Sequence, residues 1–325
     1  MAGELSIVIP LLNEAQSLRQ LYAEIKTVCE AEGLDAEIIF VDDGSTDGSW
    51  EIIRELAARD PRVRGLRFRR NFGKAAALTA GFSRATKSRV MTLDADLQDD
   101  PREIPRFLAE LEKGWDLVSG WKKVRHDPWH KVWPSRVFNW LLGKMSGVYL
   151  HDHNCGMKCY RREVLDEIHI YGELHRFIPV LAAARGFRVT EIPIHHRPRQ
   201  FGKSKYGAAR FVKGFLDLLT VKFLTGFGLR PQHFLGTFGL FSFALGAFIL
   251  IVLAAEWFFS RIIPGAEVVN LRDRPLVIYS VALLLLGAQL ISVGFLAELL
   301  TAYHVKQERT YSLAEEIGGT GKAES

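Results

Sequence analysis

The sequence contains little cysteine, and none of it in a spacing typical of metal or redox sites. Cys29, Cys155 and Cys159 are the three cysteines among 325 residues, and no Cys-x-x-Cys pair occurs. An odd, small number of cysteines argues against a disulfide framework, and the missing pair argues against a cysteine zinc site. We therefore expect the folded part of the chain to work in a reducing compartment.

A secretory leader, a basic block and an internal repeat are also missing. The N-terminus has no charged segment followed by an apolar core, so we expect no secretory signal. The formal net charge of +5 suits anionic partners such as nucleotides or phospholipid headgroups. No basic run interleaved with aromatic residues occurs, so we expect no nucleic-acid partner.

Two long segments contain no charged residue. Residues 234–255 and 276–297 are each 22 residues long, and a helix of about 20 apolar residues crosses a hydrocarbon core of about 30 Å. Both segments therefore predict membrane-spanning helices, and two buried core helices are the alternative. Gln289 is the main polar interruption, and we expect it to bond to the other helix.

Residues 1–205 alternate short apolar runs with helical patterns. This alternation is typical of an α/β fold with a mainly parallel sheet and helices on both faces. The expected strands cover residues 5–10, 36–42, 63–69, 89–94, 116–121, 156–160 and 188–195. The expected helices cover residues 17–32, 49–59, 74–85, 101–113, 132–145 and 177–185.

The chain between this domain and the first apolar segment has an amphipathic pattern. Phe211, Phe215 and Phe223 recur at helical spacing within residues 206–227, which predicts a helix lying in the membrane interface. A surface helix packed on the domain is the alternative. We thus predict a domain over residues 1–205, a juxtamembrane helix region over 206–230, a two-helix hairpin over 231–303 and a disordered tail over 304–325.

Asp94-Ala95-Asp96-Leu97-Gln98 follows the fourth expected strand and is the most informative stretch. Alternate residues of an extended chain point the same way, so Asp94, Asp96 and Gln98 converge if the chain stays extended. Ligands of open α/β sheets bind at this end of the strands. Oxygen ligands suit Mg²⁺ or Mn²⁺ shared with a substrate phosphate. A solvated acidic turn is the alternative.

Polar residues also follow the first two expected strands. After the first strand come Pro10, Asn13 and Glu14, and after the second comes Asp42-Asp43-Gly44-Ser45-Thr46-Asp47. A carboxylate at such a strand end can accept hydrogen bonds from a ribose diol, so we expect Asp42 and Asp43 to bind a ligand. Thr46 or Asp47 suits capping of the next helix.

Five motifs in matching order resemble glycosyltransferase family 2. They are Ile7-Val-Ile-Pro-Leu-Leu-Asn-Glu14, Val41-Asp-Asp-Gly-Ser-Thr-Asp47, Asn71-Phe-Gly-Lys74, Asp94-Ala-Asp-Leu-Gln98 and Gly202-Lys-Ser-Lys-Tyr206. The resemblance covers residues 5–206 and is greatest to dolichol-phosphate-mannose synthases and bacterial polyprenyl-phosphate glycosyltransferases. It implies a GT-A fold, a divalent metal and an inverting transfer of one sugar from a nucleotide to a lipid phosphate.

The resemblance also assigns roles to individual residues. It implies that Asp96 and Gln98 hold the metal, Mg²⁺ or Mn²⁺, and that Asp94 lies near the donor ribose or sugar with a catalytic role. The residues expected to bind the donor are Pro10, Asn13, Glu14, Asp42, Asp43, Asp94, Lys74, Arg125 and Arg136. A purely structural role for Lys74 is equally open. Lys122 follows the fifth expected strand and is a further candidate for the donor diphosphate.

Asp152 begins a segment, Asp152-His-Asn-Cys-Gly156, that resembles the family's Asp-x-x-x-Gly motif. The acidic residue of that motif is proposed to act as a base or to organise the acceptor site. A phosphate monoester is mostly an anion at neutral pH, since its second pKa is about 6. The nucleophile thus hardly needs a base, and a catalytic, an orienting and a structural role for Asp152 stay open.

The reaction that the resemblance implies brings a leaving diphosphate and an attacking lipid phosphate together, and cations must screen both. The residues expected to bind the acceptor phosphate are Arg199, Lys203, Ser204, Lys205 and Tyr206, and Arg197 lies just before them. A general basic patch for anionic lipid is the alternative. His175 of His175-Arg176-Phe177 is expected to be structural or on the acceptor side, because no second histidine stands at ligand spacing.

We therefore expect a membrane-anchored enzyme that moves one hexose, with UDP-glucose favoured over GDP-sugars, to undecaprenyl or a related polyprenyl phosphate. Its catalytic domain would face the cytoplasm at the inner membrane, where the nucleotide is, and the number of subunits is open. A processive polysaccharide synthase is one alternative, but its Gln-x-x-Arg-Trp motif is absent. A catalytically inert nucleotide-binding scaffold is another, and the intact motifs argue against it.

Overall fold

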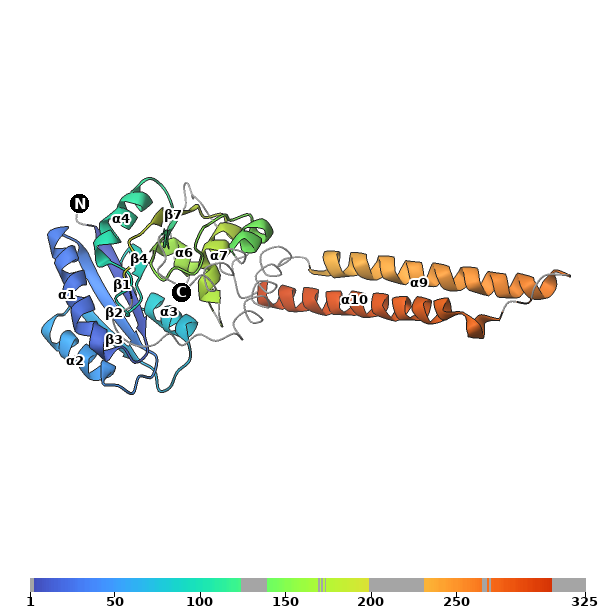
Figure 1. The fold of residues 1–325 in the computed structure, drawn as a ribbon, viewed down its shortest axis with the longest axis horizontal. Helices are drawn as coiled ribbons and strands as arrows, with labels where there is room; N and C mark the ends of the chain where they lie inside the picture. The colour runs from blue at the N-terminus through green and yellow to red at the C-terminus, as the bar shows by residue number, and fades with distance from the viewer. Residues whose placement is uncertain are drawn as a thin grey trace, which may run out of the picture. The chain divides into compact units, whose positions relative to one another are not determined.

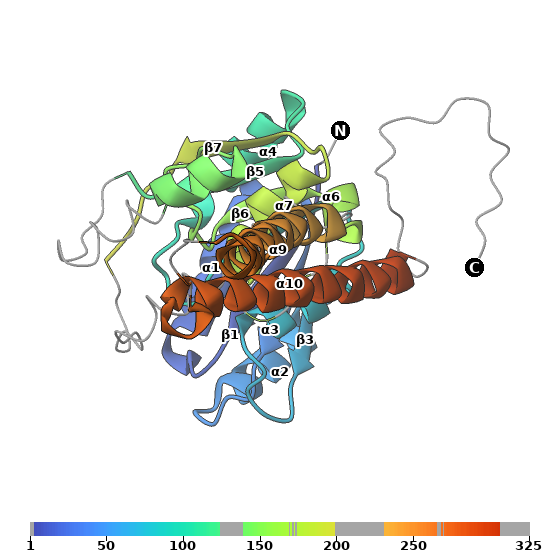
Figure 2. The same ribbon diagram turned by 90° about the vertical axis from the view of Figure 1, so that its right-hand side faces the viewer.

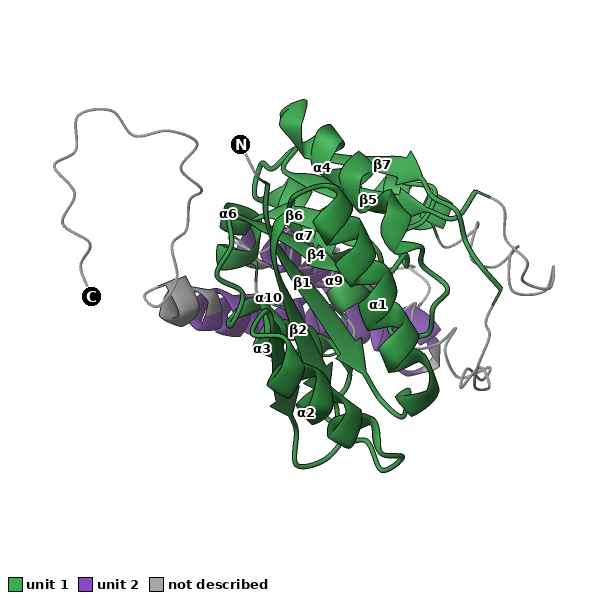
Figure 3. Cartoon of the chain, turned by 90° about the vertical axis from the view of Figure 1, so that its left-hand side faces the viewer, with its two compact units in different colours: residues 1–225, 314–325 green, residues 226–313 purple. Residues whose placement is uncertain are grey.

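The computed structural model describes residues 3–123, 139–198 except 169, 171 and 173, and 231–305 except 265–267 and 269. The chain divides into two compact units, residues 1–225 with 314–325 and residues 226–313 (Figure 3). The expected interfacial helix over 206–227 lies outside the described residues. That helix and the four-part division of the chain therefore stay predictions.

A seven-stranded sheet forms the centre of the first unit (Figure 1). Its strands are β1 (Glu4–Leu11), β2 (Asp35–Asp42), β3 (Val63–Arg67), β4 (Arg89–Thr92), β5 (Leu117–Trp121), β6 (Lys158–Arg161) and β7 (Val189–Pro193). The strand order is β3-β2-β1-β4-β6-β5-β7, with the β7 end at the top and the β3 end at the bottom of Figure 2. β6 is antiparallel to its neighbours β4 and β5, and the other pairs are parallel. The prediction of a mainly parallel sheet is confirmed.

Helices cover both faces of this sheet. They are α1 (Ala15–Ala31), α2 (Ser49–Arg59), α3 (Lys74–Phe82), α4 (Ile104–Glu112), α6 (Arg162–Asp166) and α7 (Ile178–Ala184), with 3-10 turns η1 (Pro101–Glu103) and η2 (Leu174–Phe177) before α4 and α7. Successive strand residues point to opposite faces, so Ile7 and Ile9 of β1 pack with α1 while Val8 packs with α3. Because β1 is buried on both sides, it is apolar along most of its length, as expected of central parallel strands.

The second unit is a pair of long apolar helices, α9 (Pro231–Ile262) and α10 (Pro275–Val305), which lie side by side (Figure 1). Both are long and apolar enough to cross a membrane. Only 17% and 11% of their most apolar windows are buried, which contradicts the alternative of two buried core helices. The aliphatic and aromatic surface of this unit is instead exposed.

Small residues at seven-residue intervals bring α9 and α10 together. Gly239 and Gly246 lie on α9, and Ser280 and Gly287 lie on α10. A Cβ atom at Gly287 would be 2.6 Å from the carbonyl oxygen of Gly239, so only glycine permits this approach. Gln289 is two residues beyond Gly287, about 200° around the helix, and is exposed. The expectation that Gln289 bonds to the other helix is therefore wrong.

Candidate functional site

The loops after β1 and β2 are joined by hydrogen bonds at the carboxyl edge of the sheet. The backbone N–H of Asn13 donates to Ser45 Oγ over 2.9 Å, and Asn13 Oδ1 accepts from the backbone N–H of Thr46 over 2.9 Å. Asn13 has a φ of 58°, a left-handed conformation in which asparagine is enriched. The two strand-end segments therefore form one unit, as the parallel pairing of β1 and β2 requires.

Asp47 holds the starts of two helices. Its Oδ2 accepts from the backbone N–H of Ala15, the first residue of α1, over 3.0 Å, and its Oδ1 accepts from the N–H of Ser49, the first residue of α2, over 3.1 Å. Burial would raise the pKa of Asp47, but these bonds and the Ser49 hydroxyl lower it. The capping role expected for Asp47 is confirmed, because first-turn N–H groups have no partner within their own helix.

Asp42 and Asp43 fix the loops around them. Asp42 is fully buried, and its Oδ1 accepts from the N–H of Ser45 over 2.8 Å. The two oxygens of Asp43 accept from the N–H groups of Phe72 and Gly73 over 2.7 and 3.0 Å. Asp43 thereby holds the loop that leads into α3. Sequence reasoning missed this structural role, and a role of both residues in donor binding stays a prediction.

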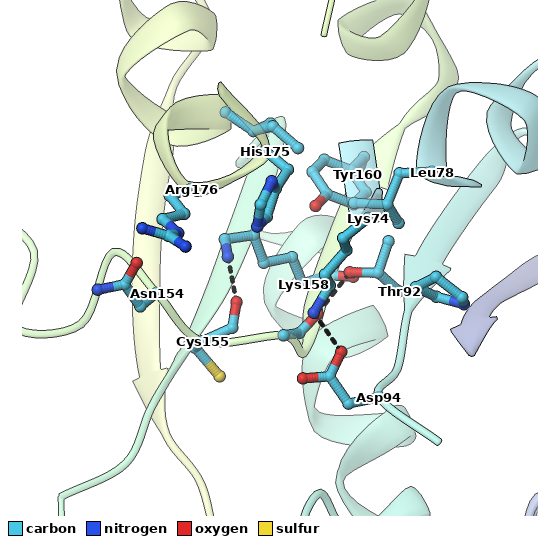
Figure 4. A pocket seen from close by; sticks show the side chains of 13 residues that line it. Lys74, Leu78, Thr92, Asp94, Asn154, Cys155, Lys158, Tyr160, His175 and Arg176 are labelled. Atoms are coloured by element: carbon cyan, nitrogen blue, oxygen red, sulfur yellow. Dashed lines mark hydrogen bonds and ion pairs between the residues drawn. The ribbon is translucent and has the colours of Figure 1, made fainter. Parts of the chain in front are cut away.

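Lys74 and Asp94 form an ion pair at the edge of the sheet. Lys74 is the first residue of α3, Asp94 follows β4, and Lys74 Nζ is 2.5 Å from Asp94 Oδ1 (Figure 4). Burial would raise the pKa of Asp94, but the charges of Lys74 and Lys122 lower it to about 2. Asp94 is therefore an anion at every physiological pH, and Lys74 holds it in place.

Gly156 makes room for the Asp94 carboxylate. A Cβ atom at residue 156 would lie 2.3 Å from Asp94 Oδ2, well inside van der Waals contact. The same turn is tied to β4, because Thr92 Oγ1 donates to the carbonyl of Gly156 over 2.7 Å. This contact explains physically why glycine stands at the end of the Asp-x-x-x-Gly segment. Asp152 at its start is buried, and its Oδ1 accepts from the N–H of Asn154 over 3.1 Å.

The chain does not stay extended between Asp94 and Gln98. β4 ends at Thr92, and Leu97 has a φ of 62°, so residues 95–97 turn. The expected convergence of Asp94, Asp96 and Gln98 by strand alternation is therefore wrong. Asp96 Oδ1 instead accepts from the N–H of Gln98 over 3.2 Å, and the Gln98 side chain lies 3.5 Å from the ring of His196.

A divalent metal at this turn would depend on few protein ligands. In the part of the chain that the structure describes, no three or more histidine, cysteine, aspartate or glutamate side chains are grouped so that they could hold a metal ion. Asp96 and Gln98 offer a carboxylate and an amide, the hard oxygen donors that suit Mg²⁺, which commonly keeps one or two carboxylates, waters and substrate phosphates as ligands. The residues present thus fit a metal that is shared with a bound diphosphate.

A cavity of about 80 Å³ lies beside Asp94 (Figure 4). Its lining comes from β1, α3, β4, the turn over residues 154–156, β6 and η2, and includes Pro10, Lys74, Asp94, Lys158, His175 and Arg176. Of the residues expected to bind the donor, Pro10, Lys74 and Asp94 are thus brought to one place. Burial and the neighbouring cations, Lys74 first among them, lower the pKa of His175 to about 3, so this imidazole is neutral.

Lys158 is a site residue that sequence reasoning missed. It is 4% exposed, and its ammonium group donates to the carbonyl of Cys155. Burial lowers its pKa. Because strand residues alternate, Lys158 lies on the same face as Tyr160 and reaches the cavity. The signal in the sequence was a lysine at the start of the apolar run before Tyr160, since a charged residue in a buried strand needs a partner.

Several expected cations have other roles or lie outside the described residues. Lys122 is partly buried and lies 3.2 Å from Asp99 Oδ1, and Arg197 is paired with Glu24 and Asp100, each over 2.7 Å. These two expected binding residues are thus engaged in ion pairs within the domain. The expected binding residues that lie outside the described part of the chain are Arg125, Arg136, Arg199, Lys203, Ser204, Lys205 and Tyr206.

The chain is similar to known proteins over most of its length. It is 37% identical to dodecaprenyl-phosphate galacturonate synthase of Rhizobium johnstonii over 310 residues, which cover 94% of this chain and 90% of the relative. Crystal structures of glucosyl-3-phosphoglycerate synthase from Mycobacterium tuberculosis share the fold of the first unit. One holds Mn²⁺, UDP and phosphoglyceric acid, with a TM-score of 0.53, 18% identity and coverage of 69% of this chain and 78% of that chain. Another holds Mg²⁺ and UDP, with a TM-score of 0.53, 18% identity and coverage of 69% and 79%.

A protein-family model matches half of the chain. The model described as glycosyl transferase family 2 matches residues 6–169, which include β1 to β6 and the Lys74, Asp94 and Gly156 constellation. The fold that the sequence predicted is therefore confirmed as GT-A-like. The chain belongs to glycosyl transferase family 2.

Proposed function

We propose that the protein moves a single sugar from a nucleoside diphosphate onto the phosphate of a polyprenyl lipid. The observation that carries this proposal is the ionised Asp94, which is seated on Gly156 and paired with Lys74 over 2.5 Å, in the loop after β4 that continues to Asp96 and Gln98. The relative from Rhizobium johnstonii, which is named for a product of this kind, matches 94% of the chain. That coverage includes the two apolar helices.

The donor would lie along the carboxyl ends of β1, β2 and β4. The joined loops around Asn13 and Asp43 would hold the nucleoside, with Pro10 and Glu14 at the first strand end and Asp42 at the second. Asp94 would accept hydrogen bonds from the donor ribose or sugar, because Lys74 keeps its carboxylate charged and oriented. Arg125 and Arg136 complete the proposed donor site.

Asp96 and Gln98 would hold a divalent metal, Mg²⁺ or Mn²⁺, whose chemistry is to neutralise charge on the leaving diphosphate. The structural neighbours from Mycobacterium tuberculosis contain such ions together with UDP, which supports this assignment. We assign Asp152, which begins the segment that ends at Gly156, to orientation of the acceptor, because a lipid phosphate that is already anionic needs orientation more than a base. One direct displacement would invert the anomeric centre.

The acceptor side is proposed from the sequence and from the second unit. Helices α9 and α10 are apolar enough to anchor the enzyme. The proposed lipid-phosphate ligands are Arg199, Lys203, Ser204, Lys205 and Tyr206, close in sequence to those helices. The catalytic domain would face the cytoplasm at the inner membrane, where nucleotide sugars are made.

The identity of the sugar is the least constrained part. UDP-glucose is the donor that the sequence favours, and the name of the relative adds an acidic sugar to the candidates. Incubating the purified full-length protein with polyprenyl phosphate and a panel of UDP- and GDP-sugars, followed by mass spectrometry of the lipid, tests the proposal. Polyprenyl phosphate carrying one sugar supports it. A polymer would favour a processive synthase, and no product with any donor would favour a scaffold.

A further inference from the structure

We propose that α10 pairs with α10 of a second copy of this chain, with the Gln289 side chains of the two copies hydrogen-bonded to each other inside the bilayer. This inference goes beyond the proposed function and holds whichever sugar the enzyme moves. It requires that α9 and α10 span a membrane, and both helices are long and apolar enough to do so. The two helices lie side by side (Figure 1), and Gln289 is exposed on the side of α10 that α9 does not cover.

Gln289 lies deep within the apolar part of α10. It is the 14th residue of the uncharged segment 276–297, which is 22 residues long. At a rise of about 1.5 Å per residue, it lies roughly 20 Å from the start of this segment and roughly 12 Å from its end. The side chain is much shorter than either distance, so its amide cannot reach the headgroups or water. In a bilayer, the amide would therefore lie among lipid tails, which cannot hydrogen-bond to it.

The serines of the two uncharged segments have hydrogen-bond partners within the hairpin. Ser280 and Ser292 donate to carbonyl groups of α10 over 2.8 and 2.9 Å, and Ser242 of α9 donates to the carbonyl of Leu283 over 3.1 Å. In the described part of the chain, the Gln289 amide takes part in no hydrogen bond. An amide without a partner is costly in an apolar medium, so a second molecule that offers one would be bound at this position.

The side of α10 that carries Gln289 has the pattern of a helix-packing surface. Exposed residues recur there at alternating intervals of three and four, as Ala282, Leu285, Gln289, Ser292 and Leu296. This spacing is the heptad pattern of helices that pack along a seam. Ala282 and Ser292 are small, and small residues let two membrane helices approach closely. Leu285 and Leu296, with exposed fractions of 67% and 58%, would pack in the same seam.

The chemistry of the amide favours a second copy of this chain as the partner. An amide side chain offers both N–H donors and a carbonyl acceptor, so two glutamines can each donate to and accept from the other. A two-fold axis brings the same residue of both copies together, and copies inserted in the same orientation have Gln289 at the same depth. A partner with a charged side chain would instead have to bury that charge there. The contact with α9 stays intact, because Gly287 lies about 200° away around α10.

The first test measures association of the full-length protein in liposomes. Two fluorescent labels would report energy transfer between copies while the protein-to-lipid ratio is lowered. Gln289→Leu should weaken association about 10-fold, the effect expected of an interhelical hydrogen bond in a membrane, whereas Gln289→Asn keeps the amide and should retain most of it. Thr237→Leu is the matched control, since this exposed threonine of α9 already donates to the carbonyl of His233. Wild-type association for Gln289→Leu, or a monomeric wild type at every ratio, would overturn the pairing.

Cysteine cross-linking locates the contact while Gln289 stays in place. The three native cysteines are buried, so oxidation by copper phenanthroline acts on an introduced, exposed thiol. The variants Ala282→Cys and Leu296→Cys, one heptad before and after Gln289, should each give a disulfide-linked dimer. Leu240→Cys, at an exposed position of α9, is the matched control and should stay monomeric. Absence of the two dimers, or equal cross-linking at residue 240, would contradict a seam along α10. Neither test uses sugar transfer, so failure of this pairing is distinguishable from failure of the proposed function.

Discussion

Replacing Gly156 with alanine should displace the Asp94 carboxylate and disable transfer without removing nucleotide binding. The added Cβ would lie 2.3 Å from Oδ2, 2.5 Å from Cγ and 2.7 Å from Oδ1 of Asp94. Rotation of the carboxylate group cannot relieve this contact, because both oxygens and Cγ of Asp94 lie too close to the added Cβ atom. Relief to ordinary contact at 3.4 Å requires a shift of 3.4 − 2.3, or 1.1 Å. The 2.5 Å pair with Lys74 cannot survive such a shift unchanged.

The expected loss follows from that displacement. A misplacement of about 1 Å in a catalytic constellation lowers the rate by about 100-fold. We expect this loss in kcat/KM for sugar transfer, while the affinity for UDP, measured by calorimetry, stays close to wild type because Asn13 and Asp43 lie on other loops. Gly3→Ala is the matched control, since its Cβ would meet the ends of two side chains at 3.2 Å, far along the chain from the site. A Gly156→Ala enzyme with a wild-type rate would show that transfer does not depend on this position of the Asp94 carboxylate.

Three further predictions concern the charge, the core and the hairpin. Lys74→Met removes the main cation that lowers the pKa of Asp94 against the effect of burial. The acidic limb of the pH–rate profile should therefore move to higher pH. An unchanged limb would mean that Asp94 does not need Lys74. Burial would raise the pKa of Glu37, but its hydrogen bonds lower it. The ionised Glu37 side chain therefore stabilises the fold fully above the unfolded-state pKa, and this stabilisation is lost as the pH falls through the folded-state pKa. Glu37→Gln should therefore lower the free energy of unfolding by about 1–3 kcal/mol at pH 7, with the difference shrinking toward pH 3 in thermal melts. Gly287→Leu should destabilise the hairpin by about 1–3 kcal/mol through overpacking, whereas Gln289→Leu, on the exposed side of α10, should not; equal melting points for the two would contradict the packing.

The arrangement of elements followed from the sequence because it depends on local patterns. Apolar runs such as residues 5–10 mark strands that are buried on both faces, and the uncharged stretch around Gly287 marks a helix that is long and apolar enough to cross a membrane. The direction of β6 did not follow, because an apolar run carries no information on whether its neighbours run parallel. Gln289 was placed wrongly because its partner was inferred from polarity alone, without the position of the glycines that set the contact face.

The site was predicted in its parts but not in its geometry. Asp94 and Lys74 were both named as donor-site residues, yet their pairing joins residues 20 apart in the sequence and depends on the start of α3. The turn at Leu97 was hidden, since leucine gives no sign of a positive φ. Lys158 was missed because its importance arises from burial beside a cavity, which depends on how β6 packs next to β4.

In the proposed reaction, Asp96 and Gln98 would hold a metal that neutralises a departing diphosphate while the sugar passes to a polyprenyl phosphate. The most direct test measures single-sugar polyprenyl phosphate by mass spectrometry, using wild-type and Asp96→Ala enzyme, each with Mg²⁺ or Mn²⁺ and with EDTA. We expect product with the wild-type enzyme only when metal is present, and a loss of about 1,000-fold or more in Asp96→Ala, comparable to removal of a main electrostatic stabiliser. Equal product formation with EDTA, or by Asp96→Ala, would contradict it.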